Sequence, residues 1–448
     1  MSEISASVLL YSNNTKENIL KISSLIPKTL HDVRIKIKRV LPITSSCDVA
    51  NAVEISLKEC EYVFLIADTI DLDILTHINC SISKIFNEKV IERCVNFCSK
   101  TVSLLEHIKV LSSQDFSGNN VVLYIQGLFI IFFVETLESP ISTYVVPFLK
   151  RRLVKNNLKR VLYIDQEVDK YDVPVDTING VAVNVNKNHH YLTVTISSVN
   201  LENLLSTEKI LKDMFKEAIL KVEECTNLQD TVYNYNFSYV KESIETIEMC
   251  FETYEPENVL VAFNGGKDCM VLLHLTLAVL KRNYSDRNLR PLCLYVQSAD
   301  PFEELEEFVE HCRQFYNLNL LKFSTKVKDA LEFVLKSKPN IKACLMGTRR
   351  DDPFAFHLKA FQMTDPNWPQ IMRVSPLLDW HYSFIWDYLL DLQVPYCKLY
   401  DQGYTSIGSR LNTKLNPYLY YHDPKQNIKK YLPAYKLLDV TKERSGRC

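Results

Sequence analysis

An apolar stretch that stops at two adjacent glycines and then resumes constrains this chain more than any other feature. Residues 259–269 read VLVAFNGGKDC, so a short run with β-branched residues meets Gly265 and Gly266. The apolar pattern resumes over residues 270–280, which is long enough for a buried helix. A strand, a glycine turn and a helix in this order point backbone N–H groups and the positive end of a helix dipole at an anion. The stretch therefore predicts a site for a nucleotide phosphate.

The residues around the glycines support this interpretation. Gly265 and Gly266 have no Cβ, so the main chain can approach a phosphate closely. Lys267 would add a cation at the mouth of the loop, and Asp268 would hold a hydrated Mg²⁺ ion or orient a neighbour. The alternative is an ordinary strand-to-helix turn, because Gly-Gly and Gly-Lys pairs are common in loops. The spacings of a Walker A loop and of a dinucleotide fingerprint are both absent.

Composition sets the class of protein. A length of 448 residues predicts two or three domains, and 47% hydrophobic with 24% charged residues is typical of a soluble globular protein. A net charge of −2 gives no reason to expect a nucleic acid or a membrane surface as partner. The 13 cysteines are never spaced C-x-x-C, which favours reduced thiols in the cytosol over disulfides or a zinc site. With no signal or transit peptide expected at the start, we predict a cytoplasmic protein.

Residues 1–153 are expected to form a first domain of alternating strands and helices. Strands are predicted at 7–11, 33–41 and 61–67, helices at 15–30, 48–60 and 72–86, and two further strands within 121–137 joined at Gly127. This order predicts a parallel sheet with helices on both faces, and a ligand would bind beyond the carboxyl ends of its strands. Those ends contain Asp68 and Asp71 but no glycine pair, and aspartate is common in turns and helix caps. We therefore do not expect catalysis here.

Residues 154–226 are expected to form a small α+β segment attached to the first domain. Strands are predicted at 160–164, 181–185 and 191–199, followed by a helix over 201–222 that Asn200 would cap. A long helix over 227–254 then opens the third part, residues 227–448, although its aromatic residues alternate between 233 and 239.

The third part continues in α/β order and is expected to be the nucleotide domain. Its further strands are predicted at 292–297, 318–323 and 341–346, and its helices at 303–316 and 327–335. The last strand ends at residues 347–353, GTRRDDP, where Arg349 and Arg350 would neutralise phosphates and the two aspartates would bind magnesium. A solvated charged turn is the alternative when this loop is considered alone.

A series of motifs in this half of the chain carries a resemblance to a known family. They are FNGGKDC (263–269), MGTRRDDP (346–353), TDPNWP (364–369), RVSPLLDW (373–380), IWD (385–387), VPY (394–396), YDQGYTSIGSR (400–410) and ERSGR (443–447). From about residue 258 to 447 the chain resembles the eukaryotic FAD synthases, or FMN adenylyltransferases, of the PAPS reductase-like superfamily. Asn264 and Cys269 replace two serines of the general ATP-pyrophosphatase loop, as this subfamily shows.

The first domain resembles, more weakly, a molybdopterin-binding-like domain. That family has a glycine-rich loop with histidine where this chain reads ADTID (67–71), which implies a degenerate structural or regulatory appendage. The implied fold class is α/β, with two doubly wound domains: a molybdopterin-binding-like one and a PAPS reductase-like, adenine nucleotide α-hydrolase-like one.

The resemblance implies that ATP and FMN give FAD and pyrophosphate, with Mg²⁺ as cofactor. The FMN phosphate would attack the α-phosphorus in line, which requires positioning and charge neutralisation rather than a covalent intermediate. The α-phosphate would bind the N–H groups of residues 264–267. The implied catalytic residues are Asn264, Asp268, Asp352, Asp365, Arg444 and Arg447; the implied substrate contacts are Phe263, Gly265, Gly266, Lys267, Gly347, Arg349, Arg350, Trp368, Asp379 and Trp380; the implied Mg²⁺ ligands are Asp268 and Asp352.

Two other functions are compatible with parts of this pattern. A sulfonucleotide reductase would need a nucleophilic cysteine in the tail, and the context of Cys448 does not match the usual one. A non-catalytic flavin or nucleotide carrier would bind FMN or FAD without releasing pyrophosphate. The resemblance also suggests handover of FAD to apo-flavoproteins.

Overall fold

The chain divides into two compact units in a computed structural model. The structure describes residues 4–11, 25–26, 29–30, 33, 35–43, 45–67, 72–95, 100–112, 120–133, 137–153, 158–165, 180–187, 191–224, 228–287, 289–423 and 428–447. Unit 1 consists of Met1–Val154, Asp401–Thr405 and Leu415–Cys448, and unit 2 consists of Lys155–Tyr400 and Ser406–Lys414.

A six-stranded sheet forms the centre of unit 1. Its order is β2-β1-β3-β8-β7-β6, in which the first four strands are parallel and β7 and β6 are antiparallel to their neighbours. The strands are β1 (Ile4–Tyr11), β2 (Ile35–Ile43), β3 (Tyr62–Ala67), β6 (Lys109–Val110), β7 (Asn120–Ile125) and β8 (Leu128–Phe133). A separate hairpin joins β4 (Val90–Val95) and β5 (Lys100–Leu105).

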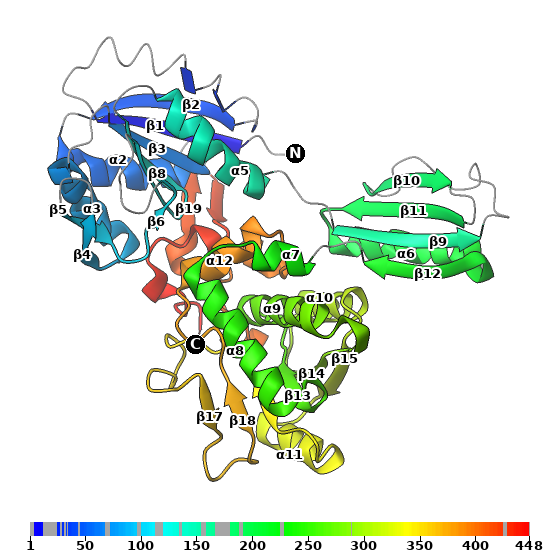
Figure 1. The fold of residues 1–448 in the computed structure, drawn as a ribbon. Helices are drawn as coiled ribbons and strands as arrows, with labels where there is room; N and C mark the ends of the chain where they lie inside the picture. Colours follow the sequence, from blue (N-terminus) through cyan, green and yellow to red (C-terminus); the bar gives the residue numbers. More distant parts are fainter. Residues whose placement is uncertain are drawn as a thin grey trace. The chain divides into compact units, whose positions relative to one another are not determined.

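Helices cover both faces of this sheet (Figure 1). On one face α2 (Ser46–Glu59) and α3 (Leu72–Phe86) bury Val53 and Ile78 against alternate strand residues such as Leu65. On the other, α5 (Val146–Leu153), which follows the short α4 (Glu138–Pro140), buries Phe148 against Tyr124 and Phe129. The predicted α/β fold is confirmed. The helix predicted at 15–30 and the carboxyl-end loops at 12–14 and 68–71 lie largely outside the described residues.

The turn between β7 and β8 confirms that residues 121–137 contain two strands. Gln126 and Gly127 both have positive φ, 42° and 93°, which is the conformation of a tight two-residue hairpin turn. A Cβ on Gly127 would lie 2.9 Å from the Glu61 carbonyl oxygen, so glycine is also required by space. In the described part of the chain, every helix is too short or too polar for a membrane crossing.

The end of the chain belongs to unit 1. It contains the hairpin of β19 (Tyr420–Asp423) and β20 (Ile428–Tyr431), and the Lys436 ammonium donates to the Glu61 carbonyl oxygen at 2.7 Å. The buried Asn416 amide donates to Thr405 Oγ1 and to the Lys442 carbonyl oxygen, both at 2.8 Å, and so holds the last turn of the chain.

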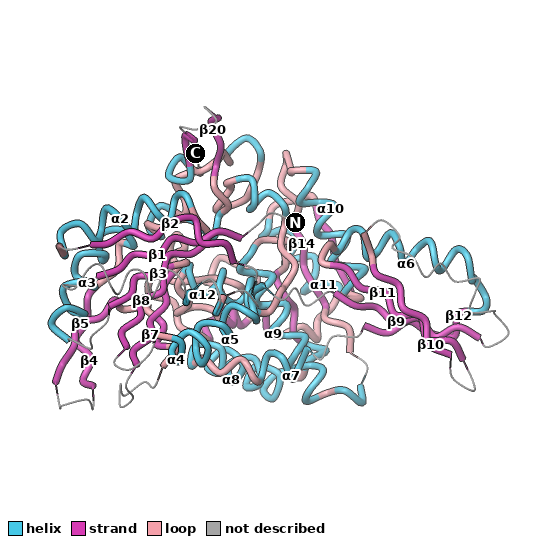
Figure 2. The backbone as a smooth tube through the Cα atoms, turned by 90° about the horizontal axis from the view of Figure 1, so that it is seen from above, coloured by secondary structure: helices cyan, strands magenta, loops and turns pink. Residues whose placement is uncertain are grey.

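A small antiparallel sheet opens unit 2 (Figure 2). Its order is β10-β11-β9-β12, formed by β9 (Leu158–Asp165), β10 (Ala182–Lys187), β11 (Tyr191–Ser198) and β12 (Ile219–Glu224), and α6 (Leu201–Phe215) packs against it. The Asn200 side chain accepts the Asn203 N–H, so the predicted cap is confirmed. The prediction that this helix continues to residue 222 is wrong. Lys216 has a φ of 39°, and the following residues pair with β9 instead.

Arg160 ties the small sheet to the rest of unit 2. This buried residue of β9 lies 3.3 Å from the Glu208 carboxylate, and its guanidinium sits 4.6 Å from the Phe315 ring centroid. Phe315 ends α10 (Glu303–Phe315). The small sheet therefore belongs to the same unit as the nucleotide domain, and the end of the chain belongs to unit 1. The expected domains had attached the small sheet to the first domain and had placed the end of the chain in the nucleotide domain.

The helix predicted over 227–254 is two helices, α7 (Leu228–Tyr233) and α8 (Ser238–Tyr254), so the single long helix is wrong. Between them Tyr235 is buried and its hydroxyl donates to Asp391 at 2.6 Å, while its ring lies 4.7 Å from that of Phe237. The alternating aromatic residues therefore mark an extended break, which tertiary contacts stabilise.

The large sheet of unit 2 has the order β15-β14-β13-β16-β18-β17 and is parallel except for β17. Its strands are β13 (Val259–Ala262), β14 (Leu292–Val296), β15 (Asn319–Phe323), β16 (Ala343–Leu345), β17 (Phe361–Met363) and β18 (Met372–Val374). Its remaining helices are α9 (Lys267–Asn283), α11 (Val327–Ser337) and α12 (Tyr382–Asp391). Figure 1 shows α9 and α11 on different sides of β13 and β14.

The strand order fixes where a ligand can bind. The chain runs from β13 outward to β14 and β15 and then returns to β16 on the other side of β13. In open parallel sheets, ligands bind beyond the carboxyl ends of the strands where the order reverses in this way. The loops after β13 and β16 are therefore the expected walls of a site.

Candidate active site

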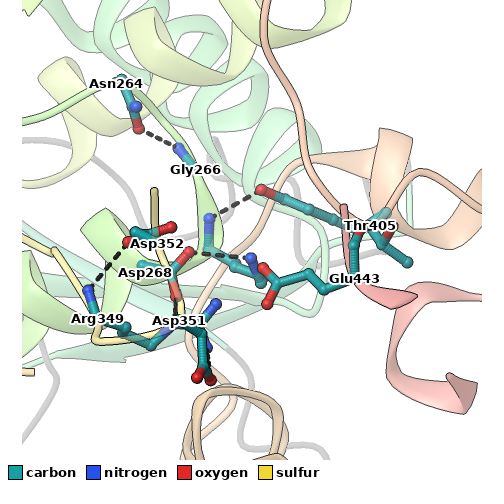
Figure 3. A network of polar contacts seen from close by, with 10 residues as sticks. Asn264, Gly266, Asp268, Arg349, Asp351, Asp352, Thr405 and Glu443 are labelled. Atoms are coloured by element: carbon teal, nitrogen blue, oxygen red, sulfur yellow. Dashed lines mark hydrogen bonds and ion pairs between the residues drawn. The ribbon is translucent and has the colours of Figure 1, made fainter. Parts of the chain in front are cut away.

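The loop after β13 is held in shape by its two glycines. Gly265 has a φ of 73°, and a Cβ there would lie 2.8 Å from Val309 Cγ2, so any side chain would collide with α10. The Gly266 N–H donates to the Asn264 side-chain oxygen at 2.9 Å, as Figure 3 shows. Phe263 is buried, whereas Asn264 is exposed. The predicted strand, glycine turn and helix are confirmed, and α9 begins at residue 267.

Lys267 lies in a different place from the one expected. Its side chain is buried, with 2% of the residue exposed, so it is not a cation at the mouth of the loop. The ammonium lies 3.0 Å from Asp268 Oδ2 and 5.5 Å and 6.0 Å from the ring centroids of Tyr382 and Tyr400. Its backbone N–H donates to the Tyr400 hydroxyl at 3.0 Å. The ammonium is therefore enclosed by groups of the protein, and its predicted contact with a substrate stays a prediction.

Asp268 joins the two predicted loops. Its Oδ1 accepts from Arg349 Nε at 2.7 Å, and its Oδ2 accepts from the Lys267 ammonium at 3.0 Å. Arg349 is only 1% exposed, so this is a buried charge cluster. Burial alone would raise the pKa of Asp268, but the two cations outweigh burial and lower the pKa to about 2. The carboxylate is therefore ionised throughout the physiological pH range.

The loop after β16 packs closely on the start of α9. A Cβ on Gly347 would lie 3.1 Å from the backbone carbonyl carbon of Asp268, which explains why glycine occurs there. The Arg349 N–H donates to Asp352 Oδ2 at 3.0 Å, and Asp351 lies 3.7 Å from Arg349 Nη1. Figure 3 shows the three carboxylates grouped around Arg349.

These carboxylates are chemically suited to Mg²⁺, which prefers oxygen ligands. Both oxygens of Asp268 already contact cations, so a metal ion there would have to share them with Lys267 or Arg349. Asp352 Oδ2 accepts the backbone N–H of Arg349 at 3.0 Å, and the roles of Asp352 and Asp268 as Mg²⁺ ligands stay predictions.

Arg350 contacts other groups of the protein, and its predicted role as a phosphate clamp stays a prediction. Its Nε and Nη2 contact the Asp379 carboxylate, and Nη1 donates to the carbonyl oxygens of Phe356 and Leu358 at 3.0 Å and 3.1 Å. The guanidinium thus ties the loop of residues 352–358 to residue 379. Phe354 in this loop is 102% exposed and has a φ of 66°. Arg350 and Asp379 hold a loop in place.

The two predicted tryptophan contacts differ in position. Trp368 follows β17 and is part of a turn in which its N–H donates to the Asp365 carbonyl oxygen at 2.9 Å. The Asp365 carboxylate is mostly exposed and lies 3.6 Å from Arg373 Nη2. Trp380, by contrast, is 3% exposed, and its indole N–H donates to Ser243 Oγ on α8 at 2.8 Å. Trp380 is therefore packed in the core beside α8, and its predicted contact with a substrate stays a prediction.

Arg444 and Arg447 lie in the last turn of unit 1, where the Arg447 N–H donates to the Arg444 carbonyl oxygen at 2.8 Å. Their predicted role stays a prediction.

Sequence reasoning missed Tyr382 and Tyr400 as parts of the site. Both are buried aromatic residues: Tyr382 follows His381, and Tyr400 opens the YDQGYTSIGSR motif, but neither position reveals a contact with Lys267. Tyr400 is 133 residues away from its partner Lys267, a separation that no local pattern reveals.

Comparison with known proteins gives two kinds of match to this part of the chain. A family model for the phosphoadenosine phosphosulfate reductase domain matches residues 258–415. A Schizosaccharomyces pombe protein named probable FAD synthase is 44% identical over 209 residues, which cover 46% of this chain and 77% of that protein. A Caenorhabditis briggsae protein with the same name is 41% identical over 212 residues, and the match spans only 40% of its length.

Among solved structures, the Candida glabrata FMN adenylyltransferase in complex with FMN and an ATP analogue is similar over 49% of this chain and 99% of that chain. It has 28% sequence identity and a TM-score of 0.44.

Proposed function

Because the chain belongs to the FAD synthase family, we propose that it transfers AMP from ATP to FMN and releases FAD and pyrophosphate. One observation supports this most: a diglycine loop and a buried Asp268–Arg349 pair meet where the order of a parallel sheet reverses. That is the usual place for a nucleotide in such a sheet.

The proposed mechanism relies on positioning and charge. The triphosphate lies along the loop of residues 264–269, where the start of α9 provides backbone N–H groups and the positive end of its dipole. Asn264, the exposed residue of this loop, releases the Gly266 N–H and turns its amide toward a phosphate oxygen. The FMN phosphate then displaces pyrophosphate in line, with no covalent intermediate on the protein.

The charged residues divide into two groups in this proposal. Lys267, Asp268 and Arg349 form an internal cluster that fixes the two loops relative to each other. Asp352 and Asp268 would both hold Mg²⁺ through their carboxylate oxygens. The bound ion would neutralise negative charge on the phosphates. Asp365 and Trp368 would contact FMN, and Arg444 and Arg447 would neutralise the leaving pyrophosphate.

The remaining assignments are proposals of the same kind. Unit 1 would be a molybdopterin-binding-like appendage without its own chemistry. We place the protein in the cytoplasm, which its free cysteines support, and FAD would be handed to apo-flavoproteins.

The rival reductase has less support. It needs a reactive thiol, and burial raises the pKa of Cys269, the thiol of the phosphate loop, to about 12, so this cysteine stays protonated. Cys448 lies outside the described residues.

The test is incubation of the full chain with FMN and MgATP, followed by chromatography for FAD and an enzymatic assay for pyrophosphate. We expect the two products in equal amounts. Tight binding of FMN or FAD without pyrophosphate would indicate a carrier. Thiol-dependent release of sulfite from a sulfonucleotide, without FAD, would indicate a reductase.

A further inference from the structure

Tyr400 contacts the phosphate loop in two ways. Its hydroxyl accepts the backbone N–H of Lys267, the first residue of α9, at 3.0 Å. Its ring, together with that of Tyr382, faces the Lys267 ammonium at 6.0 Å and 5.5 Å. The two tyrosines thus enclose a buried cation that is also paired with Asp268.

The hydrogen bond lies at a position that matters for an anion site. The first N–H groups of a helix have no partners within the helix, and these are the groups that bind phosphate. Among them, the Lys267 N–H is taken by Tyr400. The next two N–H groups of this first turn are those of Asp268 and Cys269. The Tyr400 hydroxyl therefore sets which N–H groups of the first turn are available to a ligand.

The Tyr400 hydroxyl also lies at van der Waals distance from the turn, since a Cβ on Gly266 would be 3.7 Å from it. Tyr400 is itself buried, and burial raises its pKa above the ordinary value, so the hydroxyl keeps its proton. A neutral, fixed hydroxyl is a suitable acceptor for a backbone N–H.

We propose that Tyr400 is a positioning residue for AMP transfer: it anchors the first turn of α9 by its hydroxyl and holds Lys267 by its ring, so that the N–H groups of Asp268 and Cys269 point at the α-phosphate of ATP. This inference rests on the proposed function. It adds Tyr400, which would act by holding the phosphate loop in place and would not touch the substrate itself. Lys267 becomes an internal counter-ion for Asp268, not a phosphate ligand.

A second buried tyrosine offers a matched control. Tyr388 also contacts α9 by its hydroxyl, which lies 2.8 Å from His274 Nδ1, but seven residues further along the helix. Tyr388→Phe and Tyr400→Phe each remove one buried hydroxyl that is bonded to α9. Only the second change touches the phosphate loop, so a merely structural role predicts the same behaviour for both variants.

The experiment measures kcat and KM for ATP and FMN in FAD formation by the full-length wild type, Tyr400→Phe, Tyr400→Leu and Tyr388→Phe. Rates are normalised to the folded fraction, taken from tryptophan fluorescence. We expect Tyr400→Phe to lower kcat by about tenfold, which is the effect of losing one hydrogen bond to a buried donor, with KM for FMN unchanged. Tyr400→Leu should lower kcat at least as much, and Tyr388→Phe should stay within about twofold of wild type.

The outcomes separate the two proposals. An active wild type with equal kcat values in Tyr400→Phe and Tyr388→Phe would overturn the positioning role and leave the proposed function intact. A folded wild type that forms no FAD would overturn the proposed function and this inference with it. A rise in KM for ATP without a change in kcat would also overturn the inference, because misplacement of the loop acts on the reacting geometry.

Discussion

Replacement of Asp268 by asparagine should damage both stability and catalysis. The substitution keeps the size of the side chain and removes the charge that Lys267 and Arg349 share. The difference between the ordinary pKa of 3.8 and the value of about 2 in the folded chain is worth about 2 kcal/mol of interaction with the charged form. Leaving a buried cation without its partner costs about 3–5 kcal/mol in other proteins. We expect the free energy of unfolding of unit 2 to fall by about 2–4 kcal/mol.

The tryptophan residues make this loss measurable for unit 2 alone. The chain has three tryptophans, Trp368, Trp380 and Trp386, and all of them belong to unit 2. Urea unfolding followed by tryptophan fluorescence therefore reports on this unit. Asp286→Asn is the matched control, because Asp286 is an exposed carboxylate outside the site, and it should change the unfolding free energy by less than about 0.5 kcal/mol.

FAD formation provides the second readout. Under conditions in which Asp268→Asn is folded, its rate should be about a hundredfold or more below wild type, because the two loops lose the charge that aligns them. A variant as stable as Asp286→Asn would refute the buried charge cluster. A variant that is destabilised but has a normal rate when folded would refute the catalytic part of the reasoning.

Three further predictions concern single residues. Arg350→Ala should release the loop after β16, so chymotrypsin should cut after the exposed Phe354 about tenfold faster; an unchanged rate on mass-spectrometric analysis would mean that Arg350 does not hold the loop. Burial lowers the pKa of His274 from 6.5 to about 3, so the unfolded chain binds a proton that the folded chain does not, and stability is lost as pH falls from 6.5 towards 3. When the pH falls from 7.5 to 5, this histidine should lower the free energy of unfolding by about 2 kcal/mol. In urea unfolding followed by tryptophan fluorescence, His274→Phe should lose about 2 kcal/mol less over this pH range than wild type; the same loss in both proteins would disprove the prediction. Gly347→Ala should lower FAD formation by about tenfold or more, because the new Cβ meets the backbone of Asp268 at 3.1 Å; wild-type activity would show that the two loops can separate without consequence.

Local patterns predicted the parts of the site that local physics determines. The β-branched run before residue 263, the glycine pair and the apolar run after it specify a strand, a turn with positive φ and a helix, and all three are present. The same holds for the Gln126–Gly127 hairpin turn and for Asn200, whose side chain caps α6. In each case the residues that decide the structure lie within a few positions of one another.

The features that sequence patterns did not predict share a different cause. Lys267 was expected as a cation at the mouth of the phosphate loop, but Tyr400, Tyr382 and Asp268 give its ammonium a buried environment. Arg350 was expected to bind phosphate, yet Asp379, 29 residues later, takes its guanidinium. The partner that determines such a side chain comes from another element, so spacing along the chain could not reveal it.

The errors in secondary structure follow the same rule. Residues 219–224 have a composition that suits a helix, but they lie beside β9 and pair with it as a strand. The break between α7 and α8 is stabilised by the hydrogen bond from Tyr235 to Asp391, which is 156 residues away. Tertiary contacts outweighed local propensity at both places.

The most direct test of the central claim is a crystal structure of the full chain with FMN, Mg²⁺ and a non-hydrolysable ATP analogue. The account predicts the α-phosphate within hydrogen-bond distance of N–H groups in residues 264–269, with the Asp268–Arg349 pair beside it. An ordered analogue whose phosphates lie in unit 1, with the diglycine loop empty, would contradict it.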